Sequence, residues 1–177
     1  MIKMPKSKKE ITNNDRKILE TLMGNARQSL IEISEKTGLS RQTVQKTLLK
    51  LEKDHVIWGY QPIVDEQKKG LTEFLILIKR SAKPADEKLI DKIILKKIEE
   101  TASQFGIKYG TTLYTNGIYD IIMSFLASDI KIAKRYTELI KTNYHDGVVD
   151  IQLLQSLFPI RKQGILNPNL INLKQFV

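Results

Sequence analysis

The spacing of hydrophobic residues changes character along this chain near residue 70. Before that point, apolar residues recur three or four positions apart, as on one face of a helix, within residues 18–22 and again at Val44, Leu48 and Leu51. Beyond it, short apolar runs of strand length alternate with longer segments of helical spacing. The pattern therefore predicts an α+β chain, with a small helical domain followed by a domain that contains a sheet.

Three helices are predicted within residues 13–55. Residues 13–15, Asn-Asn-Asp, can accept the free amides of a first helical turn, and Ser29 with Glu32 forms the S-x-x-E capping box of a second helix. Gly38 supplies a left-handed residue before the third helix. Short helices broken by a tight glycine turn are typical of a helix-turn-helix, which places its last helix in the major groove of DNA.

The third helix carries polar side chains opposite its apolar stripe. Arginine can pair with guanine and glutamine with adenine through two hydrogen bonds, whereas lysine suits phosphates. The candidate DNA-contacting residues are Ser40, which also caps the helix, Arg41, Gln42, Thr43, Gln45, Lys46 and Lys50. An ordinary amphipathic helix with a solvated charged face would show the same pattern, so the helix alone does not decide between the two.

Charge favours a polyanionic partner. The net charge is +9 and the sequence pI is about 9.6. Residues 1–60 carry 12 basic and 7 acidic residues, and 12 − 7 = +5; residues 61–177 carry the other 17 and 13, and 17 − 13 = +4. The first third is therefore about twice as densely charged. The basic arm at residues 1–12 is either a solvated tail or a segment that contacts phosphate or the minor groove.

The sequence offers little for catalysis. There is no cysteine, which excludes disulfides, thiolate metal sites and a cysteine nucleophile. His55 and His145 belong to no metal-spaced cluster, so we expect no catalytic residues, no metal and no cofactor. Because there is no secretory leader and no apolar run of about 18 residues, a cytoplasmic protein without membrane contact is expected.

The rest of the chain predicts a hinge and a second domain. Residues 56–64 alternate and are β-rich, and Pro62 marks them as an edge strand or an extended linker, so residues 56–70 form a β-strand hinge. Strands are expected at 71–79, 107–115, 119–127 and 148–158, with helices at 86–105 and 129–144. This βαββαβ order predicts a ferredoxin-like domain at residues 71–160, followed by a C-terminal extension at 161–177.

Several runs of the first sixty residues resemble one family. They are Asp15-Arg16-Lys17-Ile18-Leu19, Asn25-Ala26-Arg27, Gly38-Leu39-Ser40 with Thr43-Val44, Leu51-Glu52 and Val56-Ile57-Trp58-Gly59-Tyr60. The chain is identified by them as similar to the leucine-responsive regulatory protein family (Lrp/AsnC), whose DNA-binding domain is winged-helix-like. His55 departs from the glycine that is usual there, although histidine tolerates a left-handed conformation better than most residues.

The resemblance implies a function. Members are sequence-specific transcription regulators that bind double-stranded DNA as homodimers, tetramers or octamers and that respond to small molecules such as a free amino acid. The hinge connects the two domains and helps to pair subunits. The resemblance also implies an effector site at the connection that holds Asn116, Gly117, Tyr119 and Asp120.

The physics of that connection allows two explanations. Backbone amides beside a glycine can take a carboxylate, and Asp120 can take an ammonium group. Alternatively, Asn116-Gly117 is a simple two-residue hairpin turn that needs no ligand, and Asp120 caps it.

Two further expectations complete the sequence-based picture. Sirohaem decarboxylases are similar to Lrp/AsnC proteins in both halves, so a tetrapyrrole enzyme is the alternative function, but the second domain has only His145 for a basic pocket. The tail after Gly164 is apolar, with Ile165, Leu166 and Leu170 among its residues. We expect it to pad a subunit interface or to brace the DNA-binding domain.

Overall fold

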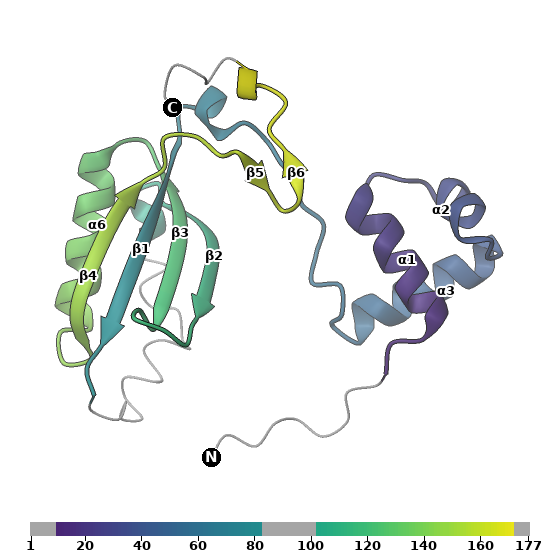
Figure 1. The fold of residues 1–177 in the computed structure, drawn as a ribbon, viewed down its shortest axis with the longest axis horizontal. Helices are drawn as coiled ribbons and strands as arrows, with labels where there is room; N and C mark the ends of the chain where they lie inside the picture. The colour runs from purple at the N-terminus through teal and green to yellow at the C-terminus, as the bar shows by residue number, and fades with distance from the viewer. Residues whose placement is uncertain (1–9, 83–101, 172–177) are drawn as a thin grey trace. The chain divides into compact units, whose positions relative to one another are not determined.

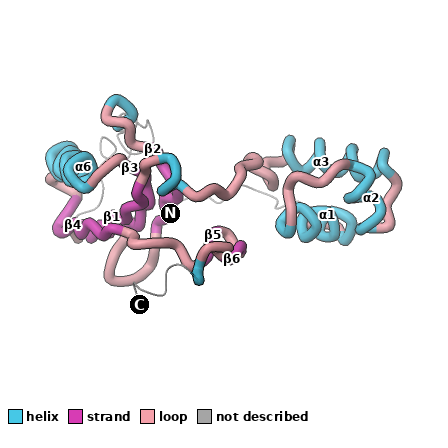
Figure 2. Tube along the Cα trace, turned by 90° about the horizontal axis from the view of Figure 1, so that it is seen from above, coloured by secondary structure: helices cyan, strands magenta, loops and turns pink. Residues whose placement is uncertain are grey.

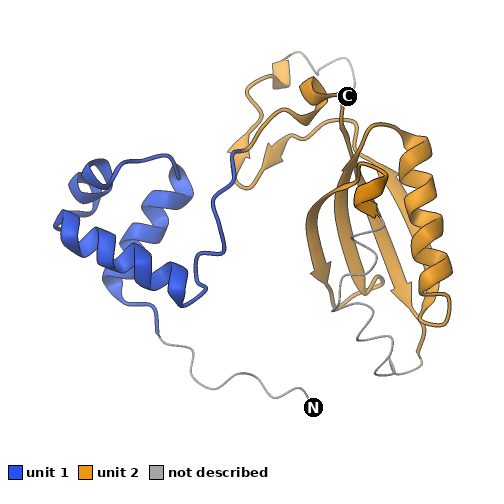
Figure 3. Ribbon diagram, turned by 180° about the vertical axis from the view of Figure 1, so that it is seen from behind, with its two compact units in different colours: residues 1–62 blue, residues 63–177 orange. Residues whose placement is uncertain are grey.

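The protein consists of two compact units, Met1–Pro62 and Ile63–Val177, so the division falls inside the expected hinge (Figure 3). The computed structural model describes residues 10–82 and 102–171. Each unit has its own hydrophobic core, and the two are described separately below.

The first unit is a bundle of three helices (Figure 1). They are α1 (Asn13–Gly24), α2 (Leu30–Thr37) and α3 (Arg41–Lys53). Ile18, Ile33, Val44 and Leu51 are buried at its centre, one or two from each helix. The helical spacing of the sequence therefore identifies the core of this unit correctly.

Short polar motifs fix where these helices begin and end. Ser29 and Glu32 form the predicted capping box, and Gly38 ends α2 with a left-handed φ of 71°. The prediction for α1 was one residue late, because Thr12, not residues 13–15, is its N-cap and Asp15 completes a second capping box. His55 adopts a φ of 54°, the left-handed conformation expected at a position where the Lrp/AsnC family usually has glycine.

The expected strand at residues 56–64 does not form. This segment is extended but unpaired, and it leads into a 3-10 helix, η1 (Glu66–Lys69), that ends at Gly70. A strand is stabilised by hydrogen bonds to a neighbour, and no described strand lies beside this one. The amides of Val56 and Ile57 donate to the Leu51 carbonyl, whereas the backbone groups of residues 58–64 form no hydrogen bond with the described residues and are therefore available to another chain.

The second unit contains a four-stranded antiparallel sheet in the order β2-β3-β1-β4, the order of a ferredoxin-like fold. The strands are β1 (Thr72–Arg80), β2 (Lys108–Tyr114), β3 (Ile121–Ala127) and β4 (Val148–Gln155). Helix α6 (Ile130–Asn143) packs along one face of the sheet (Figure 2). The helix predicted at 86–105 lies mostly outside the described residues, but residues 102–104 are helical.

The two faces of the sheet differ in what covers them. Phe74, Ile76 and Phe125 face α6 and are buried against its Tyr136 and Ile140. The opposite face, which we call the open sheet face, has an apolar centre of half-buried or exposed side chains with polar residues such as Glu73, Lys79 and Asp150 around it. The apolar members are Leu75, Leu77, Leu113, Ile122, Leu126 and Leu154, placed together by the strand register.

The C-terminal extension folds back on its own unit. It forms a small hairpin of β5 (Arg161–Lys162) and β6 (Ile165–Leu166), and Lys162 pairs with Glu73 of β1. Gly164 makes the turn possible with a φ of 85°. Residues 172–177, the last part of the extension, lie outside the described residues.

Candidate nucleic-acid interface

The start of α3 is held by two hydroxyl groups. Ser40 Oγ accepts a hydrogen bond from the Thr43 amide at 3.2 Å and lies 2.9 Å from Thr43 Oγ1. Both candidate residues therefore shape the end of the helix, as an N-cap does, and leave few donors for a partner.

Four candidate side chains on α3 are exposed and unpartnered. Arg41, Gln42, Gln45 and Lys46 make no hydrogen bond or ion pair with another residue in the described part of the chain. At 100° per residue, Gln42 and Lys46 project opposite the buried Val44, Gln45 projects about 100° from it, and Arg41 lies next to Gln45 at the edge of this side. The helix thus presents long polar groups whose hydrogen-bonding capacity is unused.

Lys50 differs from the other candidates. Its Nζ lies 2.8 Å from Asp15 Oδ2 of α1, and the Asp15 side chain is only 4% exposed. Burial raises the pKa of Asp15, but the Lys50 ammonium and the Thr12 amide and hydroxyl outweigh it and hold the pKa below its usual value. Lys50 therefore joins α3 to α1, a role that sequence spacing did not indicate.

Leu49 is a member of the outward face that sequence reasoning missed. It is 59% exposed and lies seven residues after Gln42 and four after Gln45, so it belongs to the same side of α3. The spacing alone could have found it, since a leucine outside the stripe of Val44, Leu48 and Leu51 has no core to enter. Arg41, Gln42, Gln45, Lys46 and Leu49 together are called the reading face below.

The candidate effector loop is longer than predicted. Six residues, 115–120, connect β2 to β3, and neither Asn116 nor Gly117 has the positive φ of the expected two-residue turn. The Thr115 amide donates to the Asp120 carbonyl at 2.7 Å, and Thr115 Oγ1 donates to the Tyr119 carbonyl. These bonds close the loop, and the simple hairpin turn is therefore wrong.

Asp120 is the structural centre of this loop. Its Oδ2 accepts a hydrogen bond from the Arg80 amide at 2.8 Å, and its own amide donates to the Ile78 carbonyl at 2.9 Å. The aspartate, directly before β3, therefore extends the pairing of β3 with β1 at the end of β1. Asn116 and Gly117 are exposed, whereas Tyr119 and Asp120 are half-buried.

Arg80 places a positive charge next to this loop, and sequence reasoning missed it. Its guanidinium donates to the Tyr114 hydroxyl and lies 5.8 Å from the centre of the Tyr114 ring. Arg80 is the last residue of β1, 40 positions from Asp120, so only the folded sheet brings them together. The loop thus has a carboxylate and a guanidinium on neighbouring residues.

The described residues contain no group of three or more His, Cys, Asp or Glu side chains that could hold a metal ion. His145 is exposed, with Nε2 at 3.3 Å from Asp146 and Nδ1 at 3.2 Å from the Thr142 carbonyl. In the described part of the chain its contacts are an acidic side chain and a backbone carbonyl, unlike the basic surroundings that a tetrapyrrole would need. Among the described helices, none has the length and apolar character to cross a membrane.

Comparisons with known proteins agree with this geometry. A family model described as winged helix-turn-helix DNA-binding matches residues 11–57. The regulatory protein AsnC of Escherichia coli strain K12 is 30% identical over 122 residues, which cover 68% of this chain and 73% of that protein.

Two solved structures share the fold of the chain. An AsnC family transcriptional regulator from Agrobacterium tumefaciens superposes with a TM-score of 0.63 at 20% identity, over 90% of this chain and 99% of that one. A transcriptional regulator from Neisseria meningitidis in complex with L-Met gives 0.62 at 19% identity, over 92% and 99%. The relative and these two structures are all described as regulators, and none of the names denotes an enzyme.

Proposed function

Since the chain belongs to the Lrp/AsnC family of DNA-binding transcription regulators, we propose that α3 enters the major groove and that its reading face selects the operator sequence. The observation that carries the proposal is the set of exposed, unpartnered side chains on one side of α3. Arg41 has the paired donors that read guanine, and Gln42 and Gln45 each have the donor and the acceptor that read adenine. Lys46 contacts phosphate, which fixes the register of the helix on DNA.

Lys50 keeps only part of the role that the sequence suggested. One of its three N–H donors is directed at Asp15, which leaves the others for a phosphate. Its removal would weaken DNA binding through the position of α3 as well as through the lost charge. Ser40 and Thr43 act in the same way, by fixing the start of the helix.

We further propose that the protein works as a homodimer that pairs through the open sheet face. Among the described elements, α6 covers the other face of the sheet, and no helix covers the open sheet face. Only near Glu73 does another segment contact this face, through Lys162 of the C-terminal extension. Burial of such a face is favourable by about 25 cal/mol for each Å² removed from water. The backbone of residues 58–64, which forms no hydrogen bond with the described residues, offers a second point of pairing. Dimers of this kind can assemble further into tetramers or octamers.

A dimer places two copies of α3 on one DNA molecule. Recognition helices of dimeric helix-turn-helix proteins enter successive major grooves about 34–36 Å apart, so the operator would be roughly palindromic. In this arrangement the sheet units set the separation of the two helices.

The loop of residues 115–120 is proposed as the site of a free amino acid. The Neisseria structure was solved with L-Met, which supports an amino acid as the chemical class. Asp120 retains one carboxylate oxygen for an ammonium group, and Arg80 offers a guanidinium for a carboxylate. The amino acid would shift assembly or the spacing of the DNA-binding units, with a coupling of about 1–3 kcal/mol.

The direct test of DNA reading is a titration of single variants on a selected operator and on point-mutated operators. Arg41→Ala or Gln42→Ala should reduce the discrimination between the operators by about 1–3 kcal/mol. Lys46→Ala should weaken binding to all of them alike and should flatten the salt dependence. If Arg41→Ala and Gln42→Ala leave both affinity and discrimination unchanged, α3 is not the recognition helix.

Pairing through the open sheet face has its own test. Leu77→Asp would bury a carboxylate in the interface, and its sedimentation velocity should show a monomer. Lys134→Asp, at an exposed position of α6 on the other side of the sheet, is the control and should keep the assembly of the wild type. An unchanged sedimentation coefficient for Leu77→Asp would rule out this face.

A further inference from the structure

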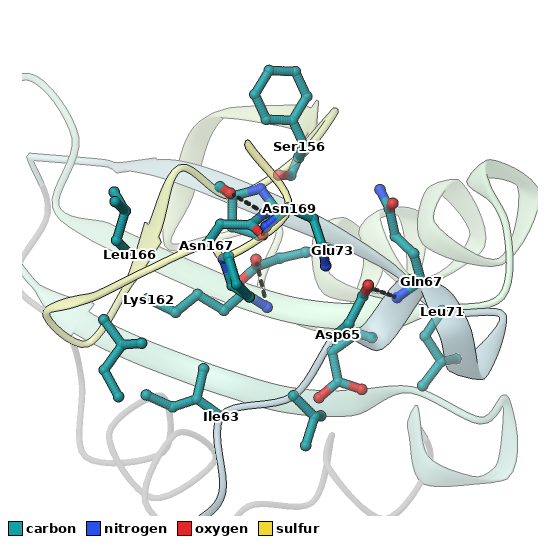
Figure 4. Close-up of a pocket in the computed structure, with 16 residues that line it drawn as sticks. Ile63, Asp65, Gln67, Leu71, Glu73, Ser156, Lys162, Leu166, Asn167 and Asn169 are labelled. Carbon is teal, nitrogen blue, oxygen red and sulfur yellow. Dashed lines mark hydrogen bonds and ion pairs between the residues drawn. The ribbon is translucent and has the colours of Figure 1, made fainter. Parts of the chain in front are cut away.

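The C-terminal extension encloses a cavity against the hinge, near the start of β1, whereas the loop of residues 115–120 lies beside the end of β1. The cavity has a volume of about 280 Å³. Its walls come from the end of the hinge, the start of β1, the segment after β4 and the β5–β6 hairpin (Figure 4). All of these segments belong to the second unit, and we call the space the hinge cavity.

The walls of the hinge cavity are tied to one another. Gln67 Nε2 donates to the Leu157 carbonyl at 2.9 Å, across 90 residues of sequence. Asn167 donates through its amide to the Ile160 carbonyl at 3.0 Å and through Nδ2 to the Pro159 carbonyl at 2.9 Å. The cavity is thus a product of folded, hydrogen-bonded segments.

The lining combines apolar walls with charged groups. Ile63, Val64, Leu71, Phe158, Ile165 and Leu166 supply the apolar part. The charged lining residues are Asp65, Glu66, Glu73 and Lys162, so the lining is acidic in a protein of net charge +9. A pocket that is mostly apolar with a few polar groups is the usual form of a small-molecule site.

Most of these charges are already neutralised within the protein. Glu66 pairs with Lys69 at 2.9 Å, and Glu73 pairs with Lys162 at 3.4 Å. Asp65 accepts the Gln67 amide through Oδ1 at 3.2 Å, and no basic side chain among the described residues pairs with it. Figure 4 shows the Asp65–Gln67 and Glu73–Lys162 contacts at separate places in the lining. The carboxylate of Asp65 is therefore the charge that a ligand can balance.

We propose that the hinge cavity binds a small organic cation, an ammonium group on a short apolar body. The ammonium would lie against Asp65, and the apolar body would contact the side chains of Val64 and Leu166. The volume is just below the lower end of the range for drug-sized ligands, which limits the ligand to a compact metabolite-like amine.

The position of the cavity gives such a ligand a regulatory consequence. Asp65 and Ile63 directly follow Pro62, where the DNA-binding unit ends. A ligand that bridges these residues to the C-terminal extension restricts the chain at the point where the two units join. This consequence rests on the proposed DNA-binding function, whereas the binding itself does not.

The test uses three probes that share one carbon skeleton: 3-methylbutan-1-amine, 3-methylbutan-1-ol and 3-methylbutanoate. Each is titrated into the ¹⁵N-labelled full chain, and the side-chain amide signals of Gln67, Asn167 and Asn169 are followed. The amine should shift these signals with an affinity at least about threefold above that of the alcohol, and the acid should bind most weakly, as a single exposed charge contact implies.

Matched variants decide where the amine binds. Asp65→Asn keeps the oxygen that accepts the Gln67 amide and removes only the charge, so the amine should lose about three- to fivefold in affinity and bind like the alcohol. Leu166→Trp places a bulkier side chain on an exposed wall position and should reduce binding of the amine and the alcohol together. Glu138→Gln removes an exposed carboxylate on α6, away from the cavity, and should change nothing.

Three results would overturn the proposal: equal affinities for the amine, the alcohol and the acid; amine binding that Asp65→Asn and Glu138→Gln change alike; or signals of the cavity that do not move. DNA affinity measured with and without the amine is a separate arm. If the amine binds but leaves DNA affinity unchanged, the regulatory consequence is wrong, whereas the proposal that the hinge cavity binds the amine is still supported.

Discussion

The reading face of α3 and the loop of residues 115–120 differ in how their polar groups are used. On α3, Arg41, Gln42 and Gln45 have no partner among the described residues. In the loop, the Thr115 hydroxyl and one carboxylate oxygen of Asp120 are hydrogen-bonded to the backbone of the loop and of β1. A polar group that is free in the folded chain can read a partner, whereas one that is already bonded holds the structure.

The comparison also sorts the residues within each region. Lys50 lies on α3 yet behaves like the loop residues, because Asp15 holds its ammonium. Gly117 lies in the loop yet behaves like a surface residue, since it is exposed and has open space around its Cα. Substitutions at these positions should therefore separate effects on folding from effects on binding.

The largest effect on folding is expected for Lys50→Ala. The change leaves the buried Asp15 carboxylate without its ammonium partner, which should lower the free energy of unfolding by about 1–3 kcal/mol. Urea denaturation followed by circular dichroism measures it. Lys46→Ala, one turn away and unpaired, is the control and should stay within about 0.5 kcal/mol of the wild type. Equal stabilities of the two variants would show that the contact of Lys50 with Asp15 does not stabilise the folded unit.

The same pair predicts a pH dependence. The pKa of Asp15 is lowered in the folded state, so its contribution to stability is present above the pKa of the unfolded chain, near 3.8, and is lost as the pH falls through the lower folded value. The stability of the wild type should therefore fall more steeply below about pH 4 than that of Asp15→Asn. Parallel curves for the two proteins between pH 5 and pH 2 would contradict the pairing.

Asp120→Ala should cost about 1–2 kcal/mol of stability, because the amide of Arg80 loses its acceptor at the end of β1. The loss should appear without any amino acid present, as a lower melting temperature. Gly117→Ala should leave the melting temperature unchanged, since nothing lies within 4 Å of an added Cβ and its φ is ordinary. If both variants are neutral, Asp120 does not hold the loop.

Leu49 is expected to contribute less than its polar neighbours. An exposed leucine in the middle of a reading face can contact the methyl group of thymine. Leu49→Ala should weaken operator binding by about 0.8 kcal/mol, the value of roughly one buried CH₂ group. Replacing one thymine of the operator with uracil, which lacks the methyl group, should cause the same loss of affinity. Combined with Leu49→Ala, that replacement should weaken binding no further. Additive losses at every thymine would exclude the contact.

The sequence predicted the fold well where a local pattern is enough. Ser29, Glu32 and Gly38 act through their nearest neighbours, and the strand-helix order of residues 71–160 follows from apolar spacing within each segment. The prediction of a strand in the hinge was wrong, because residues 56–64 have the composition of a strand but no neighbouring strand to pair with among the described residues.

The candidate site was likewise predicted only where a local pattern determines it. The outward direction of Gln42 and Gln45 follows from helical periodicity, so it can be derived from the sequence. The pairing of Lys50 with Asp15 spans 35 residues, and that of Arg80 with Asp120 spans 40, so both depend on the packed tertiary structure. Sequence spacing carries no signal for such contacts.

The central claim, that the reading face of α3 selects the bound sequence, is tested most directly by selection from a random pool of double-stranded DNA with the wild type and with Gln42→Ala. The wild type should yield a roughly palindromic motif with half-sites about 10 bp, one helical turn, or a multiple of it, apart. Gln42→Ala should lose its preference at one symmetric pair of positions and keep the rest. An identical motif from both proteins, or no motif from the wild type, would contradict the account.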